Sequence, residues 1–362
     1  MPIDFGRDVY CLLGLPIDAT DTAGALARLR AAAAVRQPCF LSTPNLNFLI
    51  ACQTDAAFRE SVIHSDLSVA DGMPLVWLGR LLGIPLPERV AGSTLFERLR
   101  ADAAHPLSVY FFGGPEGVAA AACQRLNEEQ RGLRCAGYRY PGMGSIEAMS
   151  ADEVIANINA SGADFLVVAL GARKGQAWIV RNLPRLAVPL VSHLGAVVNF
   201  VAGTVSRAPA WMQRSGLEWL WRIKEEPGLW RRYWIDGIAL LRLLFACVLP
   251  HAWHRWRHRG ASAQGHLMRV EEDGLIVLRL HGDWQAANLL PLRAAFAELA
   301  DTTAPLQLDL SATGAVDSAL VALVQLLHGH RMRCGLPLTI SGAQGTALRV
   351  FRWCRAEFVL TA

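Results

Sequence analysis

Residues 165–176 read FLVVALGARKGQ, and residues 109–117 read VYFFGGPEG. In both stretches an apolar run without polar interruption ends at a glycine-containing turn. Near-continuous apolar strands are typical of sheets that are covered on both faces, whereas a strand with one wet face alternates polar and apolar residues. The two stretches therefore predict buried parallel strands, each followed by a helix, in a layered α/β fold.

Residues 1–205 contain further segments that fit the same pattern. The expected strands are Val9–Leu13, Cys39–Ser42, Leu67–Ala70, Ser108–Gly113, Phe165–Leu170 and Leu190–Leu194. The amphipathic stretches expected to form helices between them include Thr22–Ala34, Gly117–Glu129 and Ala151–Ala160. Strands separated by helices pair in parallel through right-handed crossovers, so we expect residues 1–205 to form one Rossmann-like, parallel-sheet domain.

Polar residues follow two of these strands. LSTPNLNFL at 41–49 supplies Thr43 and Asn45, and SVADGMPLVWLGRLLGIPLPERVAG at 68–92 supplies Asp71 and Arg89. The carboxyl ends of parallel strands are where such folds hold their chemistry. A carboxylate there, near a hydroxyl, an amide and a guanidinium, predicts an acid/base site for an anionic substrate. The alternative is that these residues are turn residues and helix caps, with Asp71 capping a helix that begins at Met73.

Two glycine turns are candidate phosphate-binding elements, because glycine lets backbone amides approach an anion at a helix N-terminus. We expect donor contacts from Gly113, Gly114, Gly171, Lys174 and Gln176, with Arg173 facing the same strand edge. Plain tight turns are the alternative. HLGAVVNF at 193–200 adds Asn199 as a candidate binding residue, whereas His193 is interpreted as structural.

The cysteine pattern is typical of a cytosolic protein. The chain has 362 residues, of which 52% are hydrophobic and 18% charged, with a net charge of +4. The N-terminus lacks the basic region and cleavage site of a secretory signal. The eight cysteines form no CxxC pair, so we expect reduced, mostly buried thiols in a cytosolic protein and no zinc site. The first domain has no Asp-x-Asp pair, so nothing marks a metal-held nucleotide diphosphate. We expect no metal and no other cofactor. We also expect no nucleic-acid partner.

Residues 206–260 differ from the rest of the chain. Residues 207–259 hold ten Lys or Arg against four acids and seven of the 11 tryptophans. Trp230–Ala252 reads as a helix that Pro250 limits, and its apolar run is interrupted by Asp236 and Arg242. A basic, tryptophan-rich helix of this kind is typical of a segment lying in the membrane interface. A terminal helix packed on its own domain and a single-pass anchor are the alternatives.

GASAQGH at 260–266 predicts a short linker. Residues 261–362 then alternate apolar runs and amphipathic stretches, with LIVLRLHGDW at 275–284 expected to form a strand pair. We expect a second, smaller α/β domain that does not repeat the first.

Several motifs, taken in order, resemble the WecG/TagA/CpsF family of bacterial glycosyltransferases (glycosyltransferase family 26). They are TPNLNFL (43–49), ADGMPLVW (70–77), ERVAG (88–92), FFGGPEG (111–117), KGQAWI (174–179) and GTVSRAPAWMQRSGLEWLWR (203–222). The resemblance implies a GT-E type fold. It also implies an inverting transfer from a UDP-sugar to a polyprenyl-diphosphate-linked saccharide at the cytoplasmic face of the inner membrane. Family donors carry N-acetylmannosamine, its uronate or glucose, and exopolysaccharide or another cell-surface polysaccharide is the expected product.

The resemblance also implies roles for individual residues. Asp71 falls at the family's proposed catalytic base, Thr43 and Asn45 line the same pocket, and Arg89 lies near the donor diphosphate. The family's C-terminal appendage docks on the membrane, and its arginines help to complete the active site. By that reading Arg222, Arg231 and Arg232 contact the donor, with lipid contact as the alternative.

This chain departs from the family at two positions. The family usually reads G-x-P-K-Q-E where residues 171–176 read GARKGQ, so Gly175 stands at the expected Gln. Asn199 stands where the family often has Asp. Both departures concern the donor side of the site.

Residues 306–324, LQLDLSATGAVDSALVALV, resemble a STAS-type module. That resemblance implies that the domain binds a protein partner and that Ser318 is a candidate phosphorylation site. The alternative is that the domain keeps only the fold and serves as a docking surface. Two hypotheses follow: a membrane-associated glycosyltransferase, or a catalytically degenerate scaffold protein that acts through the STAS-like domain.

Overall fold

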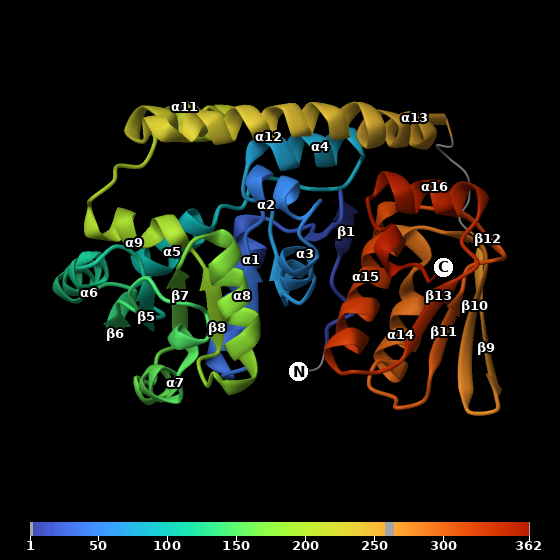
Figure 1. Ribbon diagram of the computed structural model, residues 1–362, viewed down its shortest axis with the longest axis horizontal. Coiled ribbons are helices and arrows are strands. Elements are labelled where there is room, and N and C mark those ends of the chain that lie inside the picture. The colour runs from blue at the N-terminus through green and yellow to red at the C-terminus, as the bar shows by residue number, and fades with distance from the viewer. Residues whose placement is uncertain (1–2, 258–263, 362) are drawn as a thin grey trace.

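The computed structural model describes residues 3–257 and 264–361. They form two α/β units, each with its own sheet, and a long helical segment that runs along one side of both units (Figure 1). The layered α/β prediction is confirmed for the first unit, and a separate α/β unit follows it.

The first unit is built on a six-stranded parallel sheet in the order β4-β3-β8-β7-β5-β6. Its strands are β3 (Cys39–Ser42), β4 (Leu67–Ser68), β5 (Leu107–Gly113), β6 (Leu133–Arg139), β7 (Phe165–Ala169) and β8 (Leu190–His193). The sequence did not reveal β6. It is an edge strand whose exposed residues alternate with covered ones, so it lacks the apolar run that marks its neighbours.

Helices cover both faces of this sheet. One apolar core joins the strands to α1 (Thr22–Ala34), α5 (Gly92–Ala101), α6 (Val118–Glu129) and α9 (Gly195–Ala202). A second core joins the other face to α7 (Asp152–Ala160) and α8 (Ala172–Asn182). A third apolar core, which also includes residues of the second unit, contains residues of three short helices: α2 (Leu46–Ala51), α3 (Ala56–Ile63) and α4 (Met73–Leu81).

The segment Val9–Leu13 was wrongly expected in the parallel sheet. It forms β1 (Val9–Leu12), which pairs antiparallel with β2 (Leu15–Asp18) in a separate hairpin. All eight hairpin residues are buried, because the hairpin packs against helices of both units. An apolar run shows that a strand is covered but does not show which element covers it.

The second unit has a sheet in the order β12-β10-β11-β13, with β9 antiparallel to β10. Its strands are β9 (Gly265–Glu272), β10 (Leu275–Trp284), β11 (Leu306–Asp309), β12 (Thr313–Val316) and β13 (Leu338–Ser341). Its helices are α14 (Leu290–Leu299), α15 (Ser318–Arg333) and α16 (Gly345–Trp353).

Two expectations about this unit were wrong. Residues 275–284 form a single strand rather than a strand pair. The partner strand begins at Gly265, inside the segment 260–266 predicted as a linker, of which residues 260–263 lie outside the described residues.

The helical segment begins with α10 (Ala210–Ser215) and α11 (Glu218–Glu225) and continues through a 3₁₀ turn into α12 (Trp230–Leu243) and α13 (Leu249–Arg257). Pro250 does not end the helix as expected. A π-helical turn at Leu244–Val248 directly precedes it. Proline removes a hydrogen bond and crowds the preceding turn, so the wider π turn lets the helix pass through Pro250. We call residues 218–257 the tail helix.

The expectation of reduced cysteines was wrong for one pair. Cys123 on α6 and Cys135 on β6 form a disulfide. The other six cysteines are free, and five of them are buried.

Candidate active site at the carboxyl edge of the parallel sheet

The carboxyl ends of the parallel strands meet at one edge of the first sheet. Residues from five of the strands or from the turns that follow them lie there: Thr43, Asp71, Gly113, Gly171 and His193. Most of the chemistry that the sequence predicted is therefore gathered at a single edge, which is where open α/β sheets bind their ligands.

Asp71 does not cap the helix that begins at Met73, which was the alternative interpretation of this residue. The residue before α4 is Gly72, and no side chain caps that helix. The Asp71 carboxylate instead accepts a hydrogen bond from the Gly92 amide at 3.3 Å, in the first turn of α5. A helix N-terminus favours a carboxylate, so α5 holds Asp71 in the ionised form at this place.

The surroundings of Asp71 adjust its acidity. Protein surrounds the carboxyl group, and the residue as a whole is partly exposed to solvent. Burial raises the pKa of Asp71 to about 6; the charge of Arg89 and the Gly92 amide oppose the rise, whereas Glu218 adds to it. A carboxylate with this pKa is ionised near pH 7 and still basic enough to accept a proton from a sugar hydroxyl.

Thr43 and Asn45 occupy the turn after β3. Thr43 is buried, and an added Cβ on Gly92 would lie 3.1 Å from its methyl carbon, so the start of α5 lies close against it. Asn45 is the N-cap of α2, where its side chain accepts a hydrogen bond from the Phe48 amide at 3.2 Å. The helix-cap alternative is thus confirmed for Asn45 and contradicted for Asp71.

An ion pair connects the sheet edge to the tail helix. Arg89 Nη1 lies 2.8 Å from Glu218 Oε2 on α11, and the Arg89 side chain is 12% exposed. Arg222, one turn further along α11, lies near enough for its charge to lower the pKa of Asp71. Arg231 and Arg232 are exposed on α12 and lie over the rings of their neighbours Trp230 and Tyr233. The structure therefore brings Arg89 and Arg222, and not the Arg231–Arg232 pair, toward the carboxylate.

The glycine turns are shaped as the sequence suggested. Gly113 has a φ of +100°, and a Cβ there would lie 2.7 Å from the carbonyl oxygen of Ala169, so only glycine fits. Gly114 follows it, and Gly171 precedes α8 with open space around its Cα. These two turns remain candidates for donor contacts.

The side chains of residues 173–176 do not converge on the edge as expected. Arg173 approaches Asp55 at 3.6 Å, and Lys174 donates to the carbonyl oxygen of Gly144 at 2.5 Å. Gln176 turns into the core, where its amide nitrogen donates to Ser42 Oγ at 3.1 Å. Consecutive residues of α8 point in different directions because a helix turns about 100° per residue.

Gly175 and His193 fit together sterically. A Cβ on Gly175 would lie 2.4 Å from Cδ2 of His193, so the imidazole ring fills the space that a larger residue would need. Burial lowers the pKa of His193 to about 4, which makes the ring neutral at pH 7. Within the described residues nothing hydrogen-bonds its Nε2. The departure at Gly175 therefore has a local cause, which the sequence did not show because His193 comes eighteen residues later.

Two further asparagines make contacts near the sheet edge: Asn199, which the sequence suggested, and Asn47, which it did not. Asn199 lies on α9, and its side-chain oxygen is 3.5 Å from Thr204 Oγ1. Asn47 on α2 donates to Asp236 Oδ2 of α12 at 3.1 Å, and Asp236 is buried. Asn47 is the second Asn of the TPNLN motif, so this motif both lines the sheet edge and holds the tail helix.

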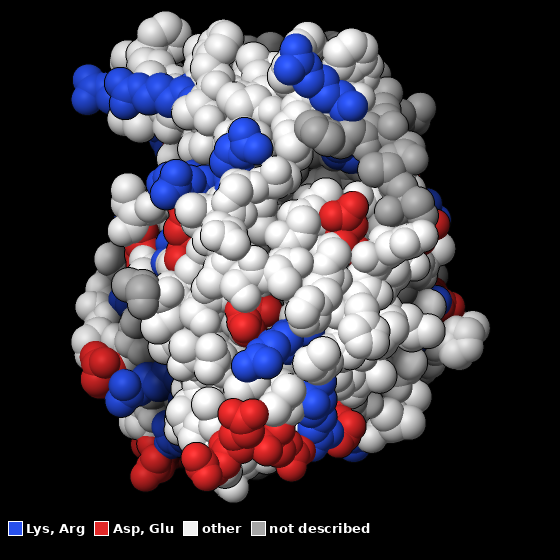
Figure 2. All heavy atoms as spheres, turned by 90° about the vertical axis from the view of Figure 1, so that its right-hand side faces the viewer, with Lys and Arg blue, Asp and Glu red and all other residues white. Residues whose placement is uncertain are grey.

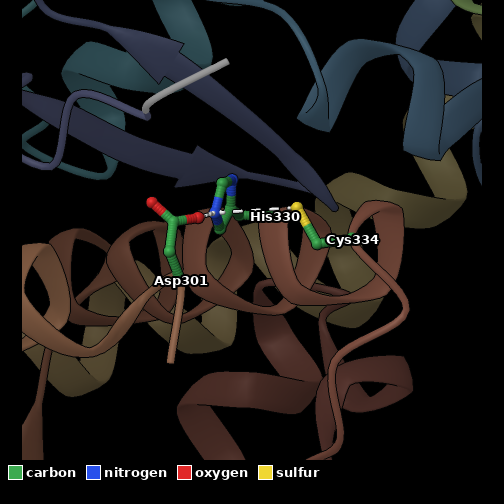
Figure 3. A group of neighbouring side chains, drawn as sticks. All are labelled: Asp301, His330 and Cys334. Atoms are coloured by element: carbon green, nitrogen blue, oxygen red, sulfur yellow. Dashed lines mark hydrogen bonds and ion pairs between the residues drawn. The ribbon is translucent and has the colours of Figure 1, made fainter. Parts of the chain in front are cut away.

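A group of three potential metal ligands lies elsewhere. Asp301, His330 and Cys334 place ligand atoms within 4.8 Å of one another in the second unit (Figure 3). The guanidinium of Arg333 lies 3.3 Å from Nδ1 of His330, which must accept because a guanidinium only donates. The proton is then on Nε2, which donates to Asp301 at 2.7 Å. Hydrogen bonds thus account for this group without an ion.

The comparison with known proteins agrees with the two-unit organisation. Residues 10–253 match the Glycosyl transferase WecG/TagA/CpsF family, and residues 268–360 match the Mlab, STAS domain family. The chain belongs to the WecG/TagA/CpsF glycosyltransferase family. It is therefore a hexosyltransferase with a C-terminal STAS domain.

Two relatives carry the same name, N-acetylglucosaminyldiphosphoundecaprenol N-acetyl-beta-D-mannosaminyltransferase. The protein from Bacillus spizizenii (strain ATCC 23059 / NRRL B-14472 / W23) is 29% identical over 194 residues, which are 53% of this chain and 74% of the relative. The protein from Bacillus subtilis (strain 168) is 28% identical over 194 residues, which are 53% of this chain and 73% of the relative.

The Arg89–Glu218 pair predicts a shift in the pH profile. Replacing Glu218 by Gln removes a negative charge that raises the pKa of Asp71, whereas the positive charge of Arg89, which lowers that pKa, remains. The acid limb of kcat/KM, expected near pH 6 in the native chain, should move to lower pH. Glu225→Gln, an exposed position on the same helix, is the matched control and should leave the limb in place. An unchanged limb in Glu218→Gln contradicts the assignment.

The contact between Gly175 and His193 predicts a coupled pair. Gly175→Ala should lower the free energy of unfolding by about 1–3 kcal/mol, because the new Cβ overlaps the ring. In a chain that also carries His193→Ala the cost of Gly175→Ala should largely vanish. Urea unfolding of the four chains measures this cycle. Strict additivity of the two substitutions means that the ring does not fill this space.

Proposed function

We propose that this chain transfers a hexose from a UDP-sugar to a polyprenyl-diphosphate-linked saccharide, with inversion, at the cytoplasmic face of the inner membrane. The donor sugar is of the N-acetylmannosamine, N-acetylmannosaminuronate or glucose type, and the product feeds exopolysaccharide or other cell-surface polysaccharide. The observation that carries the proposal is Asp71, an enclosed carboxylate with a raised pKa at the edge where the parallel strands end.

In the proposed reaction Asp71 accepts the proton of the acceptor hydroxyl. The hydroxyl oxygen forms a bond to C1 of the donor sugar, the bond from C1 to the diphosphate breaks, and UDP leaves with that electron pair. Thr43 and Asn45 position the sugars beside the base. Arg89 and Arg222 balance the charge of the diphosphate, and the turns at Gly113 and Gly171 offer backbone amides to it.

The acceptor side of the proposal comes from the relatives. Their printed name describes transfer of N-acetylmannosamine to an N-acetylglucosaminyl-diphosphoundecaprenol. A polyprenyl diphosphate stays in the membrane, so an enzyme that uses it must bring its site to the lipid surface.

The tail helix fits such a surface. A helical stretch, Pro227–Arg257, is long and apolar enough to cross a membrane by length and composition, since an 18-residue window within it has a mean hydropathy of 1.6. It lies along the two units instead, and large apolar side chains project from it at spacings of mostly three or four residues. These are Trp230, Trp234, Ile235, Ile238, Leu241, Phe245, Leu249, Trp253 and Trp256, all exposed.

The π turn keeps this apolar stripe straight. With the adjacent Trp234 and Ile235 counted as one position, its mean spacing is slightly wider than the 3.6 residues of an α-helical turn, so on a regular helix the stripe would wind around the axis. The extra residue in the turn at Leu244–Val248 returns the second half of the stripe to the side of the first half. A straight stripe can enter a flat interface along its whole length.

The charges on the tail helix also suit an anionic lipid surface. Figure 2, a view from the side of the second unit, shows Lys and Arg toward the end at which the tail helix lies, and acids mixed with further Lys and Arg toward the opposite end. The tail helix exposes Arg231, Arg232, Arg242 and Arg257. Cations beside an apolar stripe favour an anionic lipid surface. We propose peripheral binding, with this stripe in the interface.

The catalytic proposal is tested with Asp71→Asn. The amide cannot accept the proton, so kcat should fall about 10²- to 10⁴-fold while donor binding stays close to native. UDP release from UDP-N-acetylmannosamine, its uronate and UDP-glucose is measured with a polyprenyl-diphosphate-linked N-acetylglucosamine acceptor in vesicles. Native activity in Asp71→Asn, or no turnover of any donor by the native chain, rejects the mechanism and favours the scaffold hypothesis.

The membrane proposal is tested with Trp234→Glu and Phe245→Glu in one chain. Two charges in the stripe should abolish co-sedimentation with vesicles that contain anionic lipid, because buried carboxylates are costly in the interface. Leu290→Glu with Met332→Glu adds the same charge at exposed apolar positions of the STAS domain and is the matched control. If both double variants bind vesicles as the native chain does, the stripe is not the docking surface.

A further inference from the structure

Helix α15 is the most enclosed helix of the STAS domain. Of its 16 residues, 13 are buried. One side packs on its own sheet, and another packs on the β1–β2 hairpin and α3 of the glycosyltransferase domain. One continuous apolar core includes Leu12 and Leu13 of the hairpin region together with Leu320 and Leu327 of α15. The two domains therefore share a core across this helix.

Hydrogen bonds between the two domains hold them in one relative position. Gln325 on α15 donates to the carbonyl oxygen of Gly14 at 3.0 Å, and the His64 ring lies 3.2 Å from the carbonyl oxygen of Gly329. Arg293 on α14 donates to the carbonyl oxygen of Phe5 at 2.7 Å. A Cβ on Gly329 would lie 2.5 Å from Cγ2 of Ile63, so the helix and α3 approach as closely as a glycine permits.

The tail helix joins the same contact. The rings of His251 and His254 lie 5.8 and 5.4 Å from the ring of Trp353 in the STAS domain. Arg255 donates to the carbonyl oxygen of Leu82 in the glycosyltransferase domain. The end of the tail helix is thus held by both domains at once (Figure 1).

The first turn of α15 faces this junction. A cavity of about 200 Å³ lies between the three parts, lined by Tyr10, Leu82, Gly83, Pro85, His251, Arg255, Ala286, Asp317 and Ser318. Ser318 is 6% exposed. In this arrangement the hydroxyl that was a candidate for phosphorylation is covered by the chain's own glycosyltransferase domain and tail helix.

We propose that the partner of the STAS domain is its own chain. The surface around α15 is an intramolecular clamp: it holds the β1–β2 hairpin on one side and the end of the tail helix on the other, and so fixes the tail helix across the sheet edge that carries Asp71. The docking of the STAS domain does not depend on the proposed function. The expected effect of this docking on activity does rest on the proposed function.

Native cysteines report on this clamp. Cys11 on β1 and Cys354 at the end of α16 meet across the contact, with Cys11 Sγ 3.4 Å from the carbonyl oxygen of Cys354, and they are 0% and 2% exposed. Cys39 is buried in the core of the glycosyltransferase domain alone, and Cys334 is exposed. Pulse labelling of the full chain with a maleimide, read by peptide mass spectrometry, measures all four thiols together.

In the native chain Cys334 should label at once, while Cys11 and Cys354 stay protected as long as Cys39. Gln325→Glu sets a carboxylate against the carbonyl oxygen of Gly14, and it should speed labelling of Cys11 and Cys354 about tenfold without affecting Cys39. Gln307→Glu, on β11 away from the contact, is the matched control and should change nothing. If labelling of Cys39 accelerates, Gln325→Glu has unfolded the domain, and Arg293→Ala takes its place in the comparison.

Fast labelling of Cys11 and Cys354 in the native chain overturns the clamp. Faster labelling in Gln325→Glu with native transferase activity on vesicles confirms the docking but overturns its control of the site, for which we expect a severalfold loss. A native chain that protects both thiols but turns over no UDP-sugar retains the clamp and rejects the proposed function.

Discussion

The ion pair between Arg89 and Glu218 is the contact on which the site depends. Arg89 belongs to the turn that leads into α5, whose first amide holds Asp71, and Glu218 opens the helical segment that lies over the sheet edge. Both charges act on Asp71, in opposite directions. One pair of side chains therefore affects both the basicity of the carboxylate, which burial raises first, and the position of the tail helix. A tail helix that moved away would take Glu218 with it, and the loss of that negative charge would make Asp71 less basic.

The rest of the tail helix is arranged around that contact. Asn47 holds the buried Asp236 near its middle, and the STAS domain holds its end through Trp353. A helix fixed at three points can keep an apolar stripe directed outward, although such a surface is unfavourable in water. In this account the STAS domain keeps the tail helix in place. Its buried helix α15 contacts other parts of the same chain rather than a separate protein.

Much of the fold could be predicted from local pattern. Strands with unbroken apolar runs, such as Cys39–Ser42 and Phe165–Ala169, were found almost to the residue, because burial on both faces leaves a clear signal. The β1–β2 hairpin was misplaced because its apolar residues are buried against another domain. The effect of Pro250 was also mispredicted from local pattern. It depends on a π turn at Leu244–Val248, and no residue type in that turn is specific for a π turn.

The place of the candidate site residues in the fold was predictable, and the direction of their side chains was less so. Asp71, Thr43 and Arg89 lie where the pattern of strand ends placed them, since that placement depends on topology. The direction of each side chain depends on contacts distant in the sequence, which is why Asp71 reaches α5 rather than α4 and Lys174 reaches Gly144. Glu218 stood within the GLEW motif, but its role follows only from its distance to Arg89.

The central claim is that Asp71 is a base whose pKa the protein has raised. Carboxyl-carbon NMR of the full chain labelled at aspartate, with Asp71→Asn to assign the signal, measures that pKa directly. We predict that the Asp71 signal titrates with a midpoint of about 6. A midpoint at the ordinary aspartate value of 3.8 would contradict the account.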